Sequence, residues 1–382
     1  MKCQMAANGF IAVDCSQPMF IMERRSVVVY AGRGSSHSWT WLADLFETKG
    51  YVDARFADTS TFTEQLTDEI KAVIISGGDG FVIASALGHH GFSHLKGFIH
   101  RGGTYIGICA GAYLPLHSSI DPFDKFNLSN TKIENIDCDL HPNERLSPRM
   151  AVTYGNCSII HPLRGELELE ADQAAIRAPL YGGPVFREPT ADEVLVRYRS
   201  LTSETELQID RPRADSIVIG KPAVIRSRHG HGELLLFGPH LEHPRYPEAN
   251  SLFVRLIGVQ GGSSSALVAG SPEEPDKFLA RALADLKVAI LGLENRSFLV
   301  GNKLWDGGRF LELVNAMESR LHTVDGSLAG EVTNSLMRVR AEILKAKPES
   351  LLYSDEGPER LVEAARLVVD NHFRVLRESR NR

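Results

Sequence analysis

The chain has 382 residues, of which 43% are hydrophobic and 24% are charged, a composition typical of globular proteins. The formal net charge of -6, from 42 basic and 48 acidic residues, gives no electrostatic reason to expect binding to nucleic acid or to an anionic membrane surface. Five cysteines, an odd number at irregular spacing, argue against a disulfide framework and favour a reducing, cytoplasmic location.

Residues 1–25 are predicted to form an N-terminal extension outside the fold. Polar Asn8, Asp14 and Gln17 interrupt its apolar residues, and the basic pair Arg24-Arg25 follows them instead of preceding them. We therefore expect no secretory signal here. No run in the chain approaches the length of a membrane span, so no membrane partner is expected.

The next part of the chain alternates between short apolar runs and segments with helical spacing. Such alternation predicts an α/β fold with a doubly wound, mostly parallel sheet of the flavodoxin-like type. In these sheets the working loops follow the carboxyl ends of the strands. The loops at Ser35, Gly78 and Cys109 should therefore lie at the same end. The expected strands are 26–30, 52–56, 72–76 and 104–108, and the expected helices are 39–50 and 81–100.

Gly107-Ile108-Cys109-Ala110-Gly111 has the pattern of a nucleophile elbow with cysteine in place of serine. The glycines are needed because a Cβ beside the nucleophile would collide with the neighbouring chain. The thiol would lie at the first turn of a helix, whose partial positive charge favours thiolate. Pro115 should kink or shorten that helix. The alternative is a buried structural cysteine at a strand–helix junction.

The middle of the chain is predicted to be β-rich and antiparallel, ending in a buried strand at 233–238 and a closing helix at 251–257. The expected antiparallel strands are 167–176, 180–186, 194–198, 216–219 and 223–226.

Two further patterns include potential ligand residues, but neither favours a ligand site. His229 and His231 would share one face of a strand, but no third metal ligand follows at suitable spacing. The Gly-Arg-Gly-Ser-Ser loop at 32–36 lacks the spacing of the phosphate-binding fingerprints. We expect no metal and no cofactor.

Residues 259–276 are rich in Gly, Ser and Pro and are predicted to be a linker. The remainder, 277–382, has apolar residues at helical spacing and is predicted to be a helical C-terminal region. These helices would form a small bundle, or an arm that packs on the first domain or on another copy of the chain. Their exposed faces thus predict a homo-oligomer or a protein partner held through them.

A thiol nucleophile needs a base, and the base needs a group that fixes its tautomer. His240 and Glu242, two residues apart after the last strand, supply both. We expect Cys109 to act as nucleophile, His240 as base and then acid, and Glu242 as orienting carboxylate. The backbone N–H groups of Gly78 and Ala110 would form the oxyanion hole.

These motifs resemble the class I glutamine amidotransferase-like superfamily, in which a Cys-His-Glu triad has one residue between His and Glu. Within it, residues 26–258 are most similar to the amidotransferase-like N-terminal domain of biotin–protein ligases. The motifs that carry this resemblance are Val29-Tyr30-Ala31-Gly32, Gly77-Gly78-Asp79, Cys109-Ala110-Gly111-Ala112-Tyr113, Tyr181-Gly182-Gly183-Pro184 and Gly238-Pro239-His240-Leu241-Glu242.

The sequence departs from the family in three ways. His-Leu-Glu replaces the usual His-Pro-Glu, which leaves the triad intact. No Gly-Arg-Gly-Arg-type biotinoyl-adenylate loop is found, so biotin ligation is not implied, and nothing resembles an ammonia-accepting synthetase. A related intracellular-protease branch has His directly after the nucleophile, whereas this chain has Ala110.

The resulting prediction is thiol-dependent hydrolysis of a small-molecule amide, or transfer of its nitrogen, through an acyl-enzyme at Cys109. Arg33, Asp79 and Tyr181 are expected to line the pocket because their loops should face Cys109. One alternative is a non-catalytic ligand-binding or assembly module on the same fold. Another is a cysteine peptidase with an open cleft, although His89-His90 and the polar segment 121–148 could cover it.

Overall fold

The computed structural model describes residues 26–134, 151–154, 157–160, 163–189, 191–207, 209–259, 274–293, 297–300, 303–345 and 356–381. The expected N-terminal extension lies outside these residues, as do most of the expected linker and the second half of segment 121–148.

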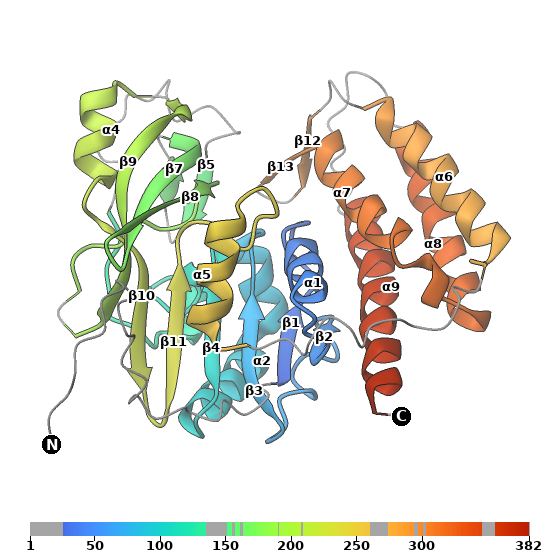
Figure 1. Ribbon diagram of the computed structural model, residues 1–382, viewed down its shortest axis with the longest axis horizontal. Coiled ribbons are helices and arrows are strands. Elements are labelled where there is room, and N and C mark those ends of the chain that lie inside the picture. Colours follow the sequence, from blue (N-terminus) through green and yellow to red (C-terminus); the bar gives the residue numbers. More distant parts are fainter. Residues whose placement is uncertain are drawn as a thin grey trace, which may run out of the picture.

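One half of a nine-stranded sheet is parallel (Figure 1). Its strands lie in the order β2-β1-β3-β4-β11, and each pairs in parallel with its neighbour. They are β1 (Ser26–Tyr30), β2 (Ala54–Ala57), β3 (Ile70–Ile75), β4 (Thr104–Ile108) and β11 (Gly232–Phe237).

Helices cover both faces of this parallel half. They are α1 (Trp39–Thr48), α2 (Gly80–His100), α3 (Ala110–Tyr113) and α5 (Pro247–Ile257). Alternate residues of β1 enter two separate cores: Val27 and Val29 pack in the core that contains α1 and α5, whereas Val28 packs in the core that contains α2. Burial on both faces explains the continuous apolar runs of these strands. The predicted doubly wound α/β fold is confirmed.

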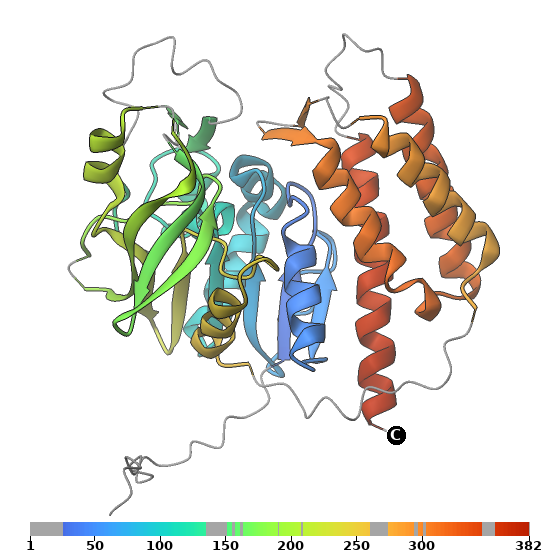
Figure 2. The same cartoon turned by 45° about the horizontal axis from the view of Figure 1, so that its top comes forward.

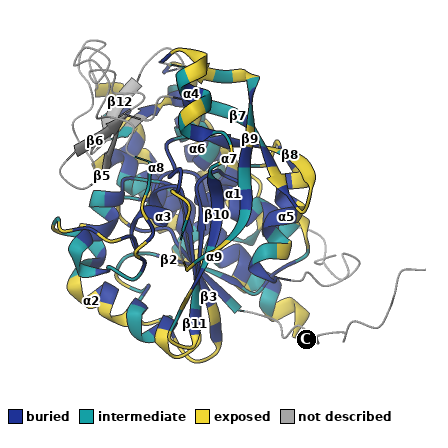
Figure 3. Ribbon diagram, turned by 90° about the vertical axis from the view of Figure 1, so that its left-hand side faces the viewer, coloured by how far each residue is buried: buried dark blue, intermediate teal, exposed yellow. Residues whose placement is uncertain are grey.

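The other half of the sheet is antiparallel and continues in the order β11-β10-β9-β7-β8, as predicted for the middle of the chain. A separate antiparallel pair, β5 with β6, lies beside it. The bounds are β5 (Ala151–Tyr154), β6 (Cys157–Ile160), β7 (Leu163–Ala171), β8 (Ala174–Leu180), β9 (Glu193–Leu207) and β10 (Pro222–His229). Figure 3 shows buried strands and exposed residues along the outer sides of α2 and α4 (Arg211–Val218).

The strand predicted at 216–219 is wrong, because residues 216–218 end helix α4. The side chain of Asp210 accepts a hydrogen bond from the Arg213 N–H at 3.0 Å, and Pro212 lies in the first turn. Both features favour a helix start. They outweigh the β-branched residues at the other end of the helix.

The C-terminal helices follow the predicted spacing: α6 (Lys277–Leu291), α7 (Gly307–Glu318), α8 (Gly326–Lys345) and α9 (Glu356–Arg380). Single-turn 3-10 helices lie at Phe123–Lys125 and Leu321–Thr323. The sequence did not predict the antiparallel hairpin of β12 (Ser297–Val300) and β13 (Lys303–Asp306) that precedes α7.

Helix α9 lies along strand β2, the edge of the parallel half (Figure 2). Phe56 donates its N–H to Asp370 at 2.7 Å and accepts from Arg366 at 3.3 Å. Arg377 donates to the Ala54 carbonyl. The C-terminal helices therefore pack on the α/β domain of the same chain.

None of the helices in the described residues is long and apolar enough to cross a membrane.

Candidate active site

Cys109 occupies a sharp turn between β4 and α3, with φ 52° and ψ -108°. A non-glycine residue adopts this conformation only when its surroundings enforce it, and such strain is concentrated at functional sites. A Cβ on Gly111 would lie 1.9 Å from the Ile75 carbonyl oxygen, and one on Gly107 would lie 2.5 Å from that of Gly111. Both glycines of the motif are therefore sterically required.

Helix α3 ends at Tyr113, after a single turn, with Pro115 close behind. This agrees with the predicted shortening. A helix of one turn has a small dipole, so the expected stabilisation of thiolate by the helix is minor. The charge state of Cys109 must be set by side chains.

The side chains of Cys109, His240 and Glu242 meet at the carboxyl ends of β4 and β11. Cys109 is 6% exposed, His240 is 3% exposed and Glu242 is fully buried. The Nδ1 atom of His240 lies 2.7 Å from Glu242 Oε1, which also accepts from Ser76 Oγ at 3.4 Å. The side chains of His240 and Cys109 are hydrogen-bonded. Since Nδ1 faces Glu242, Nε2 faces the sulfur.

This arrangement lowers the pKa of the thiol and raises the pKa of the imidazole. Burial alone would raise the pKa of Cys109, but the charge of His240, its hydrogen bond and the charge of Lys303 together lower it. Burial alone would lower the pKa of His240, but the charges of Glu242 and Cys109 and its two hydrogen bonds raise it to about 10. Both shifts favour a thiolate paired with an imidazolium over the neutral pair.

The N–H groups of Gly78 and Ala110, the predicted oxyanion donors, lie in loops after β3 and β4. In the described part of the chain, neither donates to a protein acceptor. The loop at Gly78 is fixed by hydrogen bonds from Ser36 N–H to the Gly77 carbonyl at 3.0 Å and from Asp79 N–H to the Gly34 carbonyl at 2.8 Å. A Cβ on Gly78 would lie 2.2 Å from the Gly34 oxygen.

The three residues expected to line the pocket have different surroundings. The ring of Tyr181 lies 5.8 Å from that of His240, so the structure brings it to the triad. Asp79 is buried and accepts from the N–H groups of Phe81 and Val82, which begins α2. Arg33 is exposed and pairs with Glu359 of α9 at 3.0 Å.

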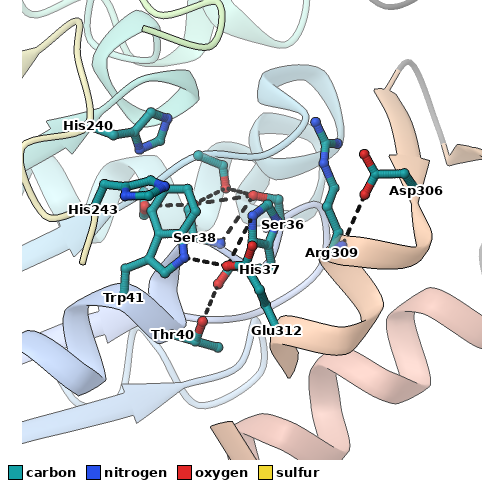
Figure 4. A network of polar contacts seen from close by, with 12 residues as sticks. Ser36, His37, Ser38, Thr40, Trp41, His240, His243, Asp306, Arg309 and Glu312 are labelled. Carbon is teal, nitrogen blue, oxygen red and sulfur yellow. Dashed lines mark hydrogen bonds and ion pairs between the residues drawn. The ribbon is translucent and has the colours of Figure 1, made fainter. Parts of the chain in front are cut away.

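The sequence did not predict the side chains that pack beside His240 (Figure 4). The ring of Trp41 lies edge-on to His240, with centroids 5.3 Å apart. Trp41 Nε1 donates to Glu312 of α7, and His37 Nε2 lies 3.6 Å from the same carboxylate. The C-terminal region therefore positions a ring that packs on the imidazole. Because Trp41 and Glu312 are 271 positions apart, no local pattern could reveal the contact.

A cavity of about 430 Å³ lies beside Gly78, between the α/β domain and the C-terminal region. Residues from both parts line it, including Gly32, Arg33, Gly34, Ser35, Gly78, Asp79, Lys303, Trp305, Pro358 and Glu359. The Gly-Ser loop at 32–36 thus contributes to a cavity wall, although it lacks a phosphate fingerprint.

The other histidines that the sequence singled out lie elsewhere. His229 and His231 flank the turn between β10 and β11, and the described residues contain no group of three side chains arranged to hold a metal ion. His90 is exposed on α2, and its ring is tilted against that of His94, with centroids 4.2 Å apart.

Comparison with known proteins agrees with the resemblance drawn from the motifs. Residues 25–129 match the family described as the N-terminal part of biotin-protein ligase. This range includes Gly78, Cys109 and Ala110 but ends before His240 and Glu242. No curated protein matches the chain.

Solved structures with similar folds include several classes of enzyme. A glutamine amidotransferase is 17% identical, with a TM-score of 0.40 over 61% of this chain and 100% of its own. A protein named as a component of GMP synthase from Thermoplasma acidophilum is 12% identical, with a TM-score of 0.36 over 62% and 94%. A beta-galactosidase from Bacillus circulans is 13% identical, with a TM-score of 0.35 over 66% and 33%.

At these identities and TM-scores the likeness to solved structures does not bear on function. The sequence match is the stronger finding, and it locates the elbow cysteine of this chain within a segment similar to the N-terminal part of biotin-protein ligases.

Proposed function

We propose that the protein is a thiol-dependent amide hydrolase, or an enzyme that transfers amide nitrogen, and that it works through an acyl-enzyme at Cys109. One observation carries the proposal: a buried thiol in a strained elbow is hydrogen-bonded to an imidazole whose other nitrogen lies 2.7 Å from a buried carboxylate. This is the arrangement that nucleophilic acyl transfer requires.

In the first half-reaction, the Cys109 sulfur attacks the amide carbonyl carbon and a C–S bond forms. The N–H groups of Gly78 and Ala110 are suited to stabilise the resulting oxyanion. His240 then donates the Nε2 proton to the amide nitrogen, and the C–N bond breaks. Ammonia or an amine leaves, and a thioester remains on Cys109.

In the second half-reaction, neutral His240 removes a proton from water, and the oxygen attacks the thioester carbon. The C–S bond breaks, a carboxylic acid is released, and the thiolate–imidazolium pair is restored. Glu242 stabilises the imidazolium in both halves. The burial of Cys109 and His240 favours a small amide over a polypeptide, which distinguishes this proposal from a cysteine peptidase.

The test is ammonia release from a panel of small primary amides, with mass spectrometry of the intact protein to detect the thioester. The wild-type protein should release ammonia and form an adduct at Cys109, and Cys109→Ala should do neither. His240→Gln should lower turnover by about a hundredfold or more, since it removes the proton donor.

The other cysteines of the chain serve as internal controls for this test. The other four of its five cysteines should carry no adduct, which separates acylation at Cys109 from general thiol chemistry. An adduct that persists in Cys109→Ala, or turnover that the variant retains, would refute the assignment. Saturable amide binding without any turnover would favour the non-catalytic module instead.

A further inference from the structure

Helix α6 has a buried side and an exposed side. It lies at the edge of the molecule, on the side of the C-terminal region that is away from the sheet (Figures 1 and 2). Its buried side packs in the main core, where α6 contacts α7 and α8. On its other side Phe278 is 78% exposed and Val288 is 71% exposed. Removing two such side chains from water is favourable, so this side of α6 is suited to contact another surface.

The two exposed apolar residues belong to a stripe that also carries two opposite charges. Phe278, Arg281, Asp285 and Val288 are all exposed, and they follow one another at spacings of three, four and three residues. Side chains at these spacings share one face of a helix. Exposed apolar side chains scattered singly are ordinary on a protein surface, whereas this spacing is that of the seam through which two helices pack.

The two charges of the stripe have no partner among the described residues. Neither Arg281 nor Asp285 makes an ion pair or a side-chain hydrogen bond there. They are four positions apart on the helix, but the base precedes the acid, which is the weaker order for a pair within one helix. By contrast, Lys287 of the same helix is bonded to Glu318 of α7 at 2.5 Å. The charges of Arg281 and Asp285 are therefore available to another molecule.

The order of the stripe is self-complementary. Its spacing is the same in both directions, so two antiparallel copies of α6 can be related by a two-fold axis at the midpoint of the stripe. Phe278 then faces Val288 of the second copy, and Arg281 faces Asp285 of the second copy. Symmetry repeats both contacts. A parallel pairing would instead place each charge beside its own copy, where like charges repel.

We infer that a second copy of this chain covers the stripe, through antiparallel pairing of α6 with α6. The inference makes specific the homo-oligomer expected from the sequence, and it does not depend on the chemistry at Cys109. One helix face is smaller than a standard interface, so the dimer should be weak, with a dissociation constant of about 10–100 µM. Dilute protein should be monomeric, and unfolding measured on dilute protein does not sense this contact.

The test is sedimentation velocity of the full chain at concentrations from about 1 µM to about 500 µM, which bracket that dissociation constant. The wild-type protein should pass reversibly from one chain to two as its concentration rises. Arg281→Glu and Asp285→Arg should each weaken the dimer by about tenfold or more, because each variant places like charges opposite one another twice.

A mixture of the two variants gives the sharpest result. When Arg281→Glu is mixed with an equal amount of Asp285→Arg, both pairs across the interface again join opposite charges. The mixture should therefore dimerise although neither variant does so alone at the same concentration. A chain that carries both substitutions should also dimerise with itself. These outcomes require the two-fold, antiparallel pairing of α6.

Three measurements serve as controls. Arg228→Glu makes the same charge change at an exposed position of β10 and should leave dimerisation unchanged. Phe278→Ser should weaken the dimer, because it removes apolar contact without changing charge. The far-ultraviolet circular dichroism of every variant should match that of the wild-type protein, which separates loss of pairing from loss of fold.

Each result supports or overturns the inference. Restored dimerisation in the mixture supports it. A wild-type protein that stays monomeric at the highest concentration would overturn it, and would mean that another part of the chain or another protein covers the stripe. A dimer that tolerates Arg281→Glu, a mixture that stays monomeric, or growth beyond two chains would overturn it as well.

Discussion

At the level of single residues, the lowered pKa of Cys109 is due to His240 more than to the helix that follows the elbow. Helix α3 has four residues, whereas the imidazole is hydrogen-bonded to the sulfur and is held by Glu242. His37 and His243 do not compete for the proton, because burial lowers the pKa of both, that of His243 to about 4. Of these three histidines, only His240 is therefore favoured to carry a positive charge.

This assignment predicts the pH dependence of alkylation by iodoacetamide. The lowered pKa of Cys109 means that the thiolate persists as the pH falls below the ordinary range for thiols. The midpoint for Cys109, mapped by mass spectrometry, should lie below those of the other cysteines. His240→Gln should move it upward, since the imidazolium charge is lost. A midpoint that does not respond to the substitution would exclude the ion pair.

At the level of elements, α9 completes the sheet. An edge strand exposes unpaired N–H and C=O groups, and proteins cover such edges or charge them. Here side chains of α9 bond directly to the backbone of β2: Asp370 accepts from Phe56, and Arg366 and Arg377 donate to carbonyls. The rings of Phe56 and Phe373 add apolar contact, with centroids 5.2 Å apart.

We expect Asp370→Ala to lower the free energy of unfolding by about 1–3 kcal/mol, because it leaves the Phe56 N–H without its charged acceptor. Urea unfolding monitored by circular dichroism measures this free energy. Asp285→Ala, on the exposed side of α6, serves as control and should change the value by less than about 0.5 kcal/mol. Equal values for the two variants would mean that α9 does not stabilise the edge through this bond.

At the level of the whole molecule, charged groups join the C-terminal region to the α/β domain. Arg320 is 1% exposed, and its guanidinium lies 2.7 Å from carboxylate oxygens of both Asp44 and Glu47 on α1. Burial alone would raise the pKa of Glu47, but its hydrogen bond to His372 and the charge of Arg320 lower it to about 2. Glu47 therefore stabilises the fold only while it is ionised.

The sign of the pH effect follows from this lowered pKa. The stabilisation is present above the ordinary carboxyl pKa of 4.5 and is lost as the pH falls towards about 2. Since the Glu47 side chain is 38% exposed, we expect a loss of only about 1 kcal/mol. Urea unfolding at several pH values should show that the free energy of unfolding falls less between pH 4.5 and about 2 in Glu47→Gln than in the wild-type protein. An equal fall in the two proteins would contradict the assignment.

The parts of the fold that the sequence predicted are those encoded locally. Apolar runs such as Val27 to Tyr30 and glycine turns such as Gly77-Gly78 indicated a parallel sheet, and Gly107 and Gly111 marked the elbow. Helix α4 was missed because Ile217 to Ile219 are β-branched, although the capping signal at Asp210 and Pro212 was present.

The side chains that surround the candidate site could not be predicted, because they come from distant parts of the chain. Lys303, Arg309 and Glu312 reach the site only because α7 and β13 pack near the ends of strands that lie far earlier in the chain. No spacing rule relates positions so far apart. A single sequence shows the turn that holds the sulfur, but not which distant side chains surround it.

The closure of β2 by α9 has a consequence for biosynthesis. Strand β2 leaves the ribosome early, at Ala54–Ala57, and the side chains that satisfy its backbone follow only at Asp370 and beyond. Until then the nascent chain carries an open edge that can pair with another copy. Between translation of these two segments the growing protein is therefore exposed to aggregation through this edge, and a chaperone that covers the edge would reduce it.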